Sequence, residues 1–334
     1  MTKKYDLYAI GNALMDMEHE VNDDFFTAQG IDKGLMTLVD EERQNALLKA
    51  LSGKLKKQQC GGSAANSIIA NAQFGGKGFY SCKVANDAIG ELYYKDMLDN
   101  GIESNLSMTT REDGVTGKCL VLITPDAERT MNTYLGVSSS LSVAEIVPEA
   151  IAQSKFMYME GYLVASPTGK EAAVYARKIA EEYNVKTALT FSDVNMVKYF
   201  KEGMLEMIGE KVDLLFTNES EAFAFTDTND IMTAREKLKE HARTFVITRG
   251  ENGAMIFDGD TFIDIEPYKV KAIDSNGAGD MFAGAFLYGI THGHTYASSG
   301  KLASLAASKV VSQFGPRLKW HEAQDIKNQV FSND

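Results

Sequence analysis

Short apolar runs alternate with amphipathic stretches over most of the chain. The first run, residues 5–10, is mostly apolar and ends at Gly11, and from Ser154 onward the alternation becomes regular. The pattern predicts strands at 5–10, 156–159, 187–191, 212–217 and 244–248, and helices at 169–183, 196–208 and 219–225. Such βαβα order is typical of a parallel sheet with helices on both faces. We therefore expect an α/β fold, a three-layer αβα sandwich with a mostly parallel central sheet.

Two segments interrupt this rhythm. Residues 13–37 are mixed and rich in aspartate, without a sustained helical period, and residues 115–134 have the pattern of a hairpin with its turn at 125–128. We expect both segments to form one small β-lid that projects from the sheet. The predicted large α/β catalytic domain then consists of residues 1–12, 38–114 and 135–334.

Composition and charge exclude several classes of function. The chain has 334 residues, of which 44% are hydrophobic, and its formal net charge is −12. Because nucleic-acid binding depends on clustered Lys and Arg, we expect no nucleic-acid partner. No stretch approaches the roughly 20 apolar residues that cross a bilayer, and Asp6 interrupts the N-terminus too early for a signal peptide. Three widely spaced cysteines indicate neither disulfides nor zinc, so we expect a cytoplasmic protein without a membrane partner.

The most informative segment is Asp274-Ser275-Asn276-Gly277-Ala278-Gly279-Asp280, which opens an apolar helix. Small residues before a helix let backbone amides converge on an anion, and the helix dipole adds positive potential there. Asp280 can accept a proton from an attacking hydroxyl while the amides stabilise a transferred phosphoryl group. An N-capping aspartate behind a turn of glycines explains the same pattern, so both interpretations remain open.

Two further glycine-rich segments are weaker signals. Gly61 and Gly62 let a ligand approach the backbone before a helix, and Asn66 can bond a hydroxyl, although a tight strand-to-helix turn is the commoner explanation. Residues 248–253 can hold a polyphosphate or form a simple hairpin or βα loop. Neither a P-loop nor a dinucleotide fingerprint is present.

Together these segments resemble the ribokinase-like, or PfkB, family of carbohydrate and nucleoside kinases. Residues 274–280 are similar to the family signature D-T-x-G-A-G-D, with Ser275 in place of threonine. Residues 61–66, 74–76 and 84–90 are similar to its N-terminal signature, and residues 218–221 to its N-x-x-E element. The resemblance covers essentially the whole chain, in the right order.

The resemblance implies a role for each matching residue. The phosphate donor would be ATP, and a hydroxyl of a small sugar or nucleoside would be the acceptor. A monovalent cation beside the anion hole occurs in some members, which makes K⁺ at Asp274 a candidate. Asp280 would be the base, Gly277, Ala278 and Gly279 the anion hole, and Asn218, Thr248, Gly250 and Gly253 the ATP site, with Asn218 and Glu221 acting on Mg²⁺ through water.

Within the family, residues 11–16 resemble the G-N-x-x-x-D opening of adenosine kinases, in which the aspartate holds ribose hydroxyls. Asp16 and Asn12 are the matching residues. Animal-type adenosine kinases also place an aromatic residue after the strand ending near Ser192, and residues 192–195 contain none. We expect phosphorylation of the 5′-hydroxyl of a ribonucleoside, adenosine first, and a monomer or a homodimer through the lid. A kinase acting on free ribose, fructose or a related sugar is the alternative.

Two alternatives from other functional classes have less support than a kinase. A non-catalytic binding protein on this scaffold would have lost the base or the anion hole, and both are retained. A nicotinamide-dependent oxidoreductase would carry the missing dinucleotide fingerprint.

Overall fold

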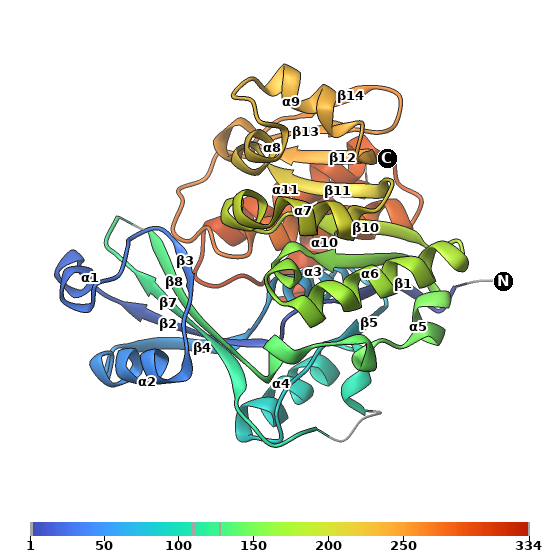
Figure 1. The fold of residues 1–334 in the computed structure, drawn as a ribbon. Coiled ribbons are helices and arrows are strands. Elements are labelled where there is room, and N and C mark those ends of the chain that lie inside the picture. The colour runs from blue at the N-terminus through green and yellow to red at the C-terminus, as the bar shows by residue number, and fades with distance from the viewer. Residues whose placement is uncertain (1–2, 108–110, 127, 333–334) are drawn as a thin grey trace.

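The computed structural model describes residues 3–107, 111–126 and 128–332, and its largest element is a nine-stranded sheet (Figure 1). The strand order is β14-β13-β12-β11-β10-β9-β1-β5-β6, and the strands from β6 to β12 in this order run parallel. Strands β13 and β14 are antiparallel at one edge. The strand bounds are β1 Tyr5–Ile10, β5 Gly78–Ser81, β6 Glu103–Ser104, β9 Ser154–Glu160, β10 Lys186–Thr190, β11 Val212–Asn218, β12 Ala242–Thr248, β13 Ala254–Phe257 and β14 Phe262–Ile265.

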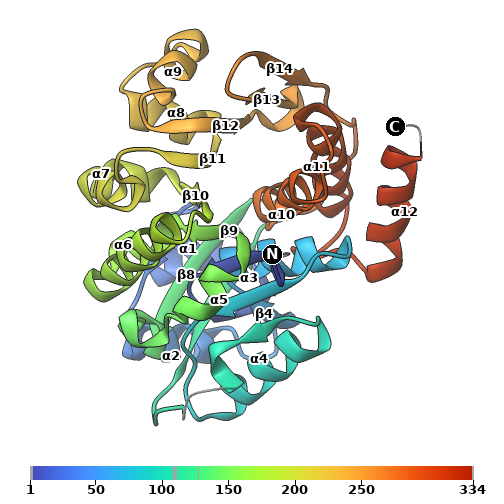
Figure 2. The same cartoon turned by 90° about the vertical axis from the view of Figure 1, so that its right-hand side faces the viewer.

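Helices cover both faces of this sheet. Figure 2 shows α6 and α7 on one side and α10 and α11 on the other. The first layer contains α5 Pro148–Ala152, α6 Pro167–Glu182, α7 Val194–Ile208, α8 Glu219–Thr226 and α9 Ile231–Leu238, and the second contains α3 Ser63–Gln73, α4 Ala88–Asp99, α10 Ala278–Thr291, α11 Tyr296–Val311 and α12 Trp320–Phe331.

Strand β1 shows why the central strands are apolar on both sides. Leu7 and Ala9 pack into the core under α3 and α10, whereas Tyr8 and Ile10 pack into the core under α6. Successive side chains of a strand point to opposite faces, and here both faces are covered. The mostly apolar run that predicted β1 is therefore a consequence of the three layers, and the predicted α/β sandwich is confirmed.

A second sheet of five strands lies beside the carboxyl ends of the parallel strands, at the left of Figure 1. Its order is β3-β8-β7-β2-β4, and β2 pairs with β7 in parallel and with β4 antiparallel. We call it the small sheet. Its strands are β2 Leu14–Glu20, β3 Met36–Leu38, β4 Leu55–Gly61, β7 Thr116–Ile123 and β8 Arg129–Gly136.

The two faces of the small sheet have different partners. Helices α1 Asp23–Gln29 and α2 Glu41–Ala50 cover the outer face, where Leu120 and Leu122 of β7 contact Phe25, Phe26 and Leu47. The alternate residues of β7 point to the inner face, which is turned towards the large sheet. Those inner residues are Cys119, Val121 and Ile123, with Leu14 and Met131 beside them.

The small sheet differs from its sequence-based outline in two ways. Residues 13–37 were expected to lack a helix, but Asn22 caps α1 and Gly30 ends it in the left-handed region. Helix α2 and strand β4 were assigned to the large domain, yet α2 packs on the small sheet and β4 pairs with β2. The alternation that predicts a strand is hidden in β2, because Asp16, Glu18 and His19 are polar and buried.

No helix in the described part of the chain is both long and apolar enough to cross a bilayer. Cys60, Cys82 and Cys119 are buried free thiols.

Candidate active site

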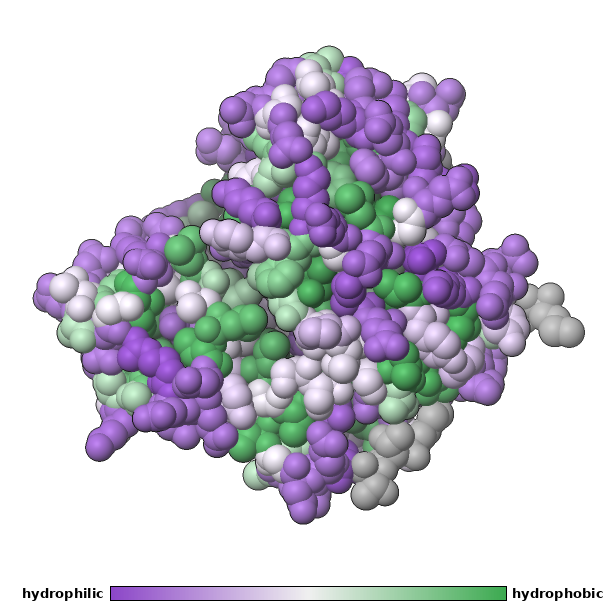
Figure 3. Space-filling model, viewed as in Figure 1, coloured by the Kyte–Doolittle hydropathy of each residue, from purple (hydrophilic) through white to green (hydrophobic). Residues whose placement is uncertain are grey.

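A cavity of about 530 Å³ lies between the two sheets, and Figure 3 shows hydrophobic residues gathered around the hollow beside the small sheet. Ligands of open α/β sheets bind outside the carboxyl ends of the strands. Here residues from the carboxyl ends of five parallel strands line the cavity: Asn12 after β1, Glu160 of β9, Thr190 of β10, Asn218 of β11 and Thr248 of β12. The sheet topology thus concentrates most of the predicted site residues in one place.

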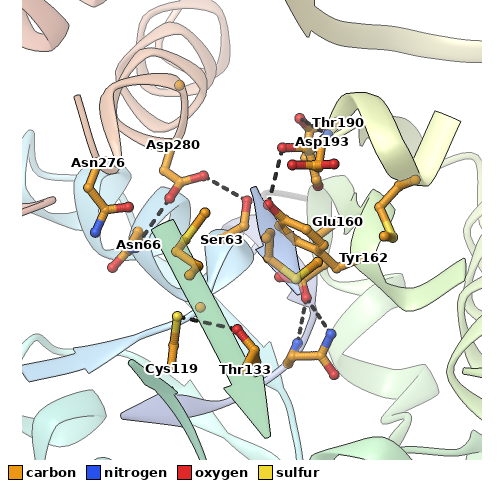
Figure 4. Close-up of a pocket in the computed structure, with 18 of the residues that line it drawn as sticks. Ser63, Asn66, Cys119, Thr133, Glu160, Tyr162, Thr190, Asp193, Asn276 and Asp280 are labelled. Carbon is orange, nitrogen blue, oxygen red and sulfur yellow. Dashed lines mark hydrogen bonds between the residues drawn. The ribbon is translucent and has the colours of Figure 1, made fainter. Parts of the chain in front are cut away.

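Helix α10 starts at this cavity. Its N-cap is Gly277, whose φ of 72° lies in the left-handed region, and a Cβ there would collide with Pro316. Asp280, in the first turn, accepts hydrogen bonds from Ser63 Oγ (2.7 Å) and Asn66 Nδ2 (3.2 Å), both on α3 (Figure 4). Asp280 does not cap the helix, so the structural interpretation of this residue is wrong.

The carboxylate of Asp280 faces the cavity but is largely surrounded by protein. This burial raises the pKa of Asp280 to about 6, although the hydrogen bonds from Ser63 and Asn66 and the charge of Arg317 oppose the shift. A carboxylate with a pKa near neutrality is suited to accept a proton at physiological pH. Gly277 and Gly279 also line the cavity, and Ala278 lies between them.

A carboxylate from β9 holds the residue that follows β1. Glu160 accepts hydrogen bonds from the Asn12 backbone N–H (2.8 Å), from Asn12 Nδ2 (2.9 Å) and from the Ala64 N–H (2.8 Å). Burial raises the pKa of Glu160 to about 7, and the three donors act against it. The Asn12 side chain is therefore fixed at the cavity wall.

Asp16 lies in β2, at the inner face of the small sheet. It is 7% exposed and lines the cavity, and in the described part of the chain no protein group donates a hydrogen bond to its carboxylate. Burial raises the pKa of Asp16 to about 7, with Arg317 acting in the opposite direction. Gly61 leaves room for it, because a Cβ on Gly61 would overlap the Asp16 carboxylate. Gly61 thus supports Asp16 and does not itself line the cavity, whereas Gly62 and Asn66 do.

The small sheet adds an apolar wall to the cavity. Its lining residues are Leu14, Met36, Leu38, Cys119, Val121, Met131 and Leu135. Tyr162 lies across the cavity from this wall, and its hydroxyl donates to the Ser192 carbonyl oxygen (3.4 Å). The segment after β9 therefore places an aromatic ring at the cavity, close to Ser192.

Asn218 and Glu221 form a capping box at the start of α8. Glu221 Oε2 accepts from the Asn218 N–H (2.9 Å), and Asn218 Oδ1 accepts from the Glu221 N–H (2.8 Å). Both residues line the cavity, and burial raises the pKa of Glu221 to about 7. Within the described ranges no three His, Cys, Asp or Glu side chains form a metal cluster. Mg²⁺ that keeps its waters and binds phosphate needs only one or two protein carboxylates. Glu221 Oε1 also accepts from Asn218 Nδ2 (2.8 Å), so this carboxylate would meet such an ion through water and not directly.

The segment after β12 is a hairpin turn to β13, which was one of the open interpretations. Thr248 lines the cavity at the end of β12. Gly250 and Gly253 lie beyond the cavity lining, both with positive φ, and a Cβ on Gly253 would meet the Ile265 carbonyl oxygen.

Asp274 is fully buried, and its carboxylate is occupied. Oδ1 accepts from the Asn276 N–H (2.7 Å), Oδ2 accepts from the Gly315 N–H (2.8 Å), and Arg129 of β8 forms an ion pair with it. A potassium ion at Asp274 would face the Arg129 guanidinium, so this arrangement does not fit the ion.

Arg129 is the main site residue that sequence reasoning missed. Apart from Asp274, its guanidinium makes no hydrogen bond with the described residues, yet it is buried and lines the cavity with Asp280 and Gly279. Ser63, Glu160 and Tyr162 were also missed. The signal for Glu160 was present, because a carboxylate directly follows an apolar strand there.

A family model, described as pfkB family carbohydrate kinase, matches residues 44–323. The chain belongs to this family. It is therefore a phosphotransferase that acts on the hydroxyl group of a sugar or nucleoside.

Relatives within the family differ in their named acceptors. The structure is similar to a probable sugar kinase from Rhizobium etli, with a TM-score of 0.92 and 32% identity over 98% of this chain and 99% of that one. It is equally similar to adenosine kinase from Sinorhizobium meliloti, with a TM-score of 0.91, 34% identity and the same coverage. Adenosine kinase from Saccharomyces cerevisiae is 26% identical over 93% of this chain and 96% of its own length.

Proposed function

We propose that this chain transfers the γ-phosphoryl group of ATP to the 5′-hydroxyl of a ribonucleoside, with adenosine as the preferred acceptor. The observation that carries the choice of a nucleoside is the apolar wall of the small sheet, to which Leu14, Val121 and Met131 belong. A free sugar carries hydroxyls around its ring, and burying them without partners costs free energy. The flat face of a nucleobase suits this wall better, and Tyr162 offers a ring opposite it.

The ribose would bind at the boundary between the wall and the polar floor. The Asp16 carboxylate lines the cavity there without a hydrogen bond from a described protein group, and two vicinal hydroxyls can supply donors to it. Asn12, held by Glu160, and Asn66 are the neighbouring polar groups. Adenosine kinase from Sinorhizobium meliloti, 34% identical to this chain, supports the choice of adenosine.

The phosphoryl group would transfer next to α10. Asp280 would take the proton of the 5′-hydroxyl as the oxygen attacks phosphorus. The backbone N–H groups of residues 277–279 at the helix start would stabilise the charge of the phosphoryl group. Arg129, which lines the same cavity, would add a positive charge from the small sheet. Little covalent chemistry is required beyond this positioning.

The donor would lie along the ends of β11 and β12. Asn218 and Thr248 line this part of the cavity, and Gly250 and Gly253 shape the turn beside it. Mg²⁺, held by water on Glu221, would neutralise phosphate charge. The small sheet would act as a lid over the acceptor. Because α1 and α2 already cover its outer face, we favour a monomer over a dimer through that face.

A kinase of free sugars is the second candidate, supported by the similarity to the probable sugar kinase from Rhizobium etli. Ribose would keep the contact with Asp16 but leave the apolar wall empty. Burying about 150 Å² of aromatic surface at ~25 cal/mol/Å² is worth about 4 kcal/mol, roughly a thousandfold in affinity.

A coupled assay with Mg-ATP, run over adenosine, guanosine, inosine, cytidine, ribose and fructose, tests the proposal. We expect kcat/KM for adenosine to exceed that for ribose by at least about 100-fold, given that surface. Ribose or fructose as the better acceptor would reject the nucleoside assignment. No phosphorylation of any acceptor by a folded protein would reject the whole proposal.

A further inference from the structure

Arg317 lies between α11 and α12, and its side chain is only 13% exposed. The guanidinium connects three elements. Nε donates to Asn66 Oδ1 on α3 (3.0 Å), one terminal nitrogen donates to Asp96 Oδ2 on α4 (2.7 Å), and the other donates to the Cys60 carbonyl oxygen on β4 (2.5 Å). Arg317 does not itself line the cavity, so its effect on the site must pass through a neighbour.

Asn66 is that neighbour, because an amide has one accepting and one donating end. A guanidinium can only donate, so the Asn66 oxygen must face Arg317. The Asn66 NH₂ group is then directed at Asp280 Oδ2 (3.2 Å), while Ser63 Oγ donates to the other carboxylate oxygen (2.7 Å). A reversed amide would bring two acceptor oxygens together at Asp280.

We propose that Arg317 is a positioning residue for phosphoryl transfer: it orients the Asn66 amide and, through it, the Asp280 carboxylate. This inference rests on the proposed function, since it requires Asp280 to be the base. The contact with Cys60 extends the same unit to the start of the Gly61-Gly62 turn, which leads from the small sheet into α3.

The charge of Arg317 also favours the ionised form of Asp280, in addition to the orientation that Arg317 provides through Asn66. The groups that interact electrostatically with Asp280 are the carboxylates of Asp16 and Glu160, the phenols of Tyr158 and Tyr162, and the Arg317 guanidinium. Arg317 is the cation of this set, and it lowers the pKa of Asp280 against the effect of burial. Without Arg317, the pKa of Asp280 should rise, so the base should remain protonated up to a higher pH.

Two substitutions at Arg317 separate orientation from charge. Arg317→Lys keeps the charge but loses the planar fork, so kcat at saturating acceptor should fall about 10- to 100-fold, in line with a small misplacement of a catalytic group. The acidic limb of its pH profile should stay in place. Arg317→Met should show a similar fall in kcat and, in addition, an acidic limb displaced to higher pH.

Two control variants test whether the role of Arg317 is only structural. Arg177 is another buried arginine, remote from the cavity lining and paired with Glu181, and Arg177→Met should leave kcat and the pH profile unchanged. Asp96→Asn removes the ion pair of Arg317 but leaves its hydrogen bond to Asn66, so kcat should change by no more than about threefold. A fall in kcat with Asp96→Asn equal to that of Arg317→Lys would show that only the tie to α4 matters.

A double variant provides a test that does not depend on the stability of Arg317→Met. If Arg317 acts through Asn66, then Arg317→Lys combined with Asn66→Ala should be no slower than Asn66→Ala alone. Multiplying effects would overturn the inference. An active Asp280→Asn variant would instead reject the proposed base, so the two failures are distinguishable.

Discussion

Arg129 on β8 of the small sheet forms an ion pair with Asp274, which precedes α10, and the two side chains are only 8% and 0% exposed. The pair joins the small sheet to the segment that contains the predicted anion hole. The pair therefore connects the small sheet to the large domain beside the cavity. The remaining N–H groups of Arg129 have no hydrogen-bond partner in the described part of the chain.

Replacing Arg129 with glutamine should destabilise the protein, because Asp274 would keep a buried charge without its counterion. Removing one partner of a buried pair costs about 3–5 kcal/mol. Asp274→Asn removes that charge, so the double variant should recover much of the loss in urea unfolding. Its kcat should stay low if Arg129 also meets the phosphoryl group. Recovery of kcat together with stability would show that Arg129 acts through the ion pair alone.

The parallel core was predictable from the sequence, whereas the outline of the small sheet was not. Strand β1 has the predicted bounds, because both faces of the large sheet are covered and its strands are mostly apolar. In β2 the buried Asp16 and Glu18 replace the apolar positions that reveal a strand. Local sequence therefore fails where the strand carries polar residues for the cavity.

The candidate site shows the same division. The glycine-rich segment before α10 and the polar residues after β1 could be found as motifs. Glu160 follows an apolar strand and could have been found in the same way. Arg129 could not be assigned from local pattern, because its position in the cavity depends on pairing between segments that are distant in sequence. Gly250 and Gly253 were included by resemblance, although neither lines the cavity.

Hydrogen exchange tests the proposed lid. Residues 13–37 and 115–134 contribute strands to one sheet through the β2–β7 pairing. Both should gain protection together when the acceptor and a non-hydrolysable ATP analogue bind, because closure removes water from the cavity. Edge strand β14, remote from the cavity lining, is the internal control. Protection limited to one of the two segments would contradict a lid that moves as a unit.

Acceptor binding should depend on the ionisation of Asp16. Its pKa of about 7 lies well above the usual range, so lowering the pH below 7 protonates the carboxylate that the ribose hydroxyls need. The KM for adenosine should rise about tenfold per pH unit below 7, as expected for a single protonation, while the KM for ATP changes little. Asp16→Asn should raise the acceptor KM and abolish this dependence.

Asp16→Asn should weaken acceptor binding but stabilise the fold. A folded-state pKa above the unfolded value means that ionised Asp16 destabilises the fold, fully above pH 7 and progressively less towards pH 4. Asp16→Asn should therefore raise Tm at pH 8 and raise it less at pH 5. Equal changes at both pH values would contradict a carboxylate that is buried without partners.

Preference for a nucleoside over a free sugar should depend on the apolar wall. Val121 lies on the inner face of the small sheet and is 1% exposed, and Val121→Thr introduces a hydroxyl at almost constant volume. The KM for adenosine should rise about tenfold, since an unsatisfied hydroxyl costs about 1–3 kcal/mol, whereas ribose turnover should hardly change. Val246→Thr in the buried strand β12 controls for loss of stability. An equal effect of Val121→Thr on both acceptors would argue against a base-binding wall.

Asp280→Asn provides the strictest test of the chemistry. Because Gly277, not Asp280, is the N-cap of α10, the substitution leaves the cap intact, and loss of a buried charge should keep Tm equal or raise it slightly. General-base assistance is worth about 10²- to 10⁴-fold, so kcat should fall on that scale while KM for both substrates changes little. In the wild type, kcat should decrease as the pH falls below about 6, since protonated Asp280 cannot accept the hydroxyl proton. Single-turnover measurements at pH 5–8 on both proteins check the assignment, and a folded variant that keeps most of its rate would refute it.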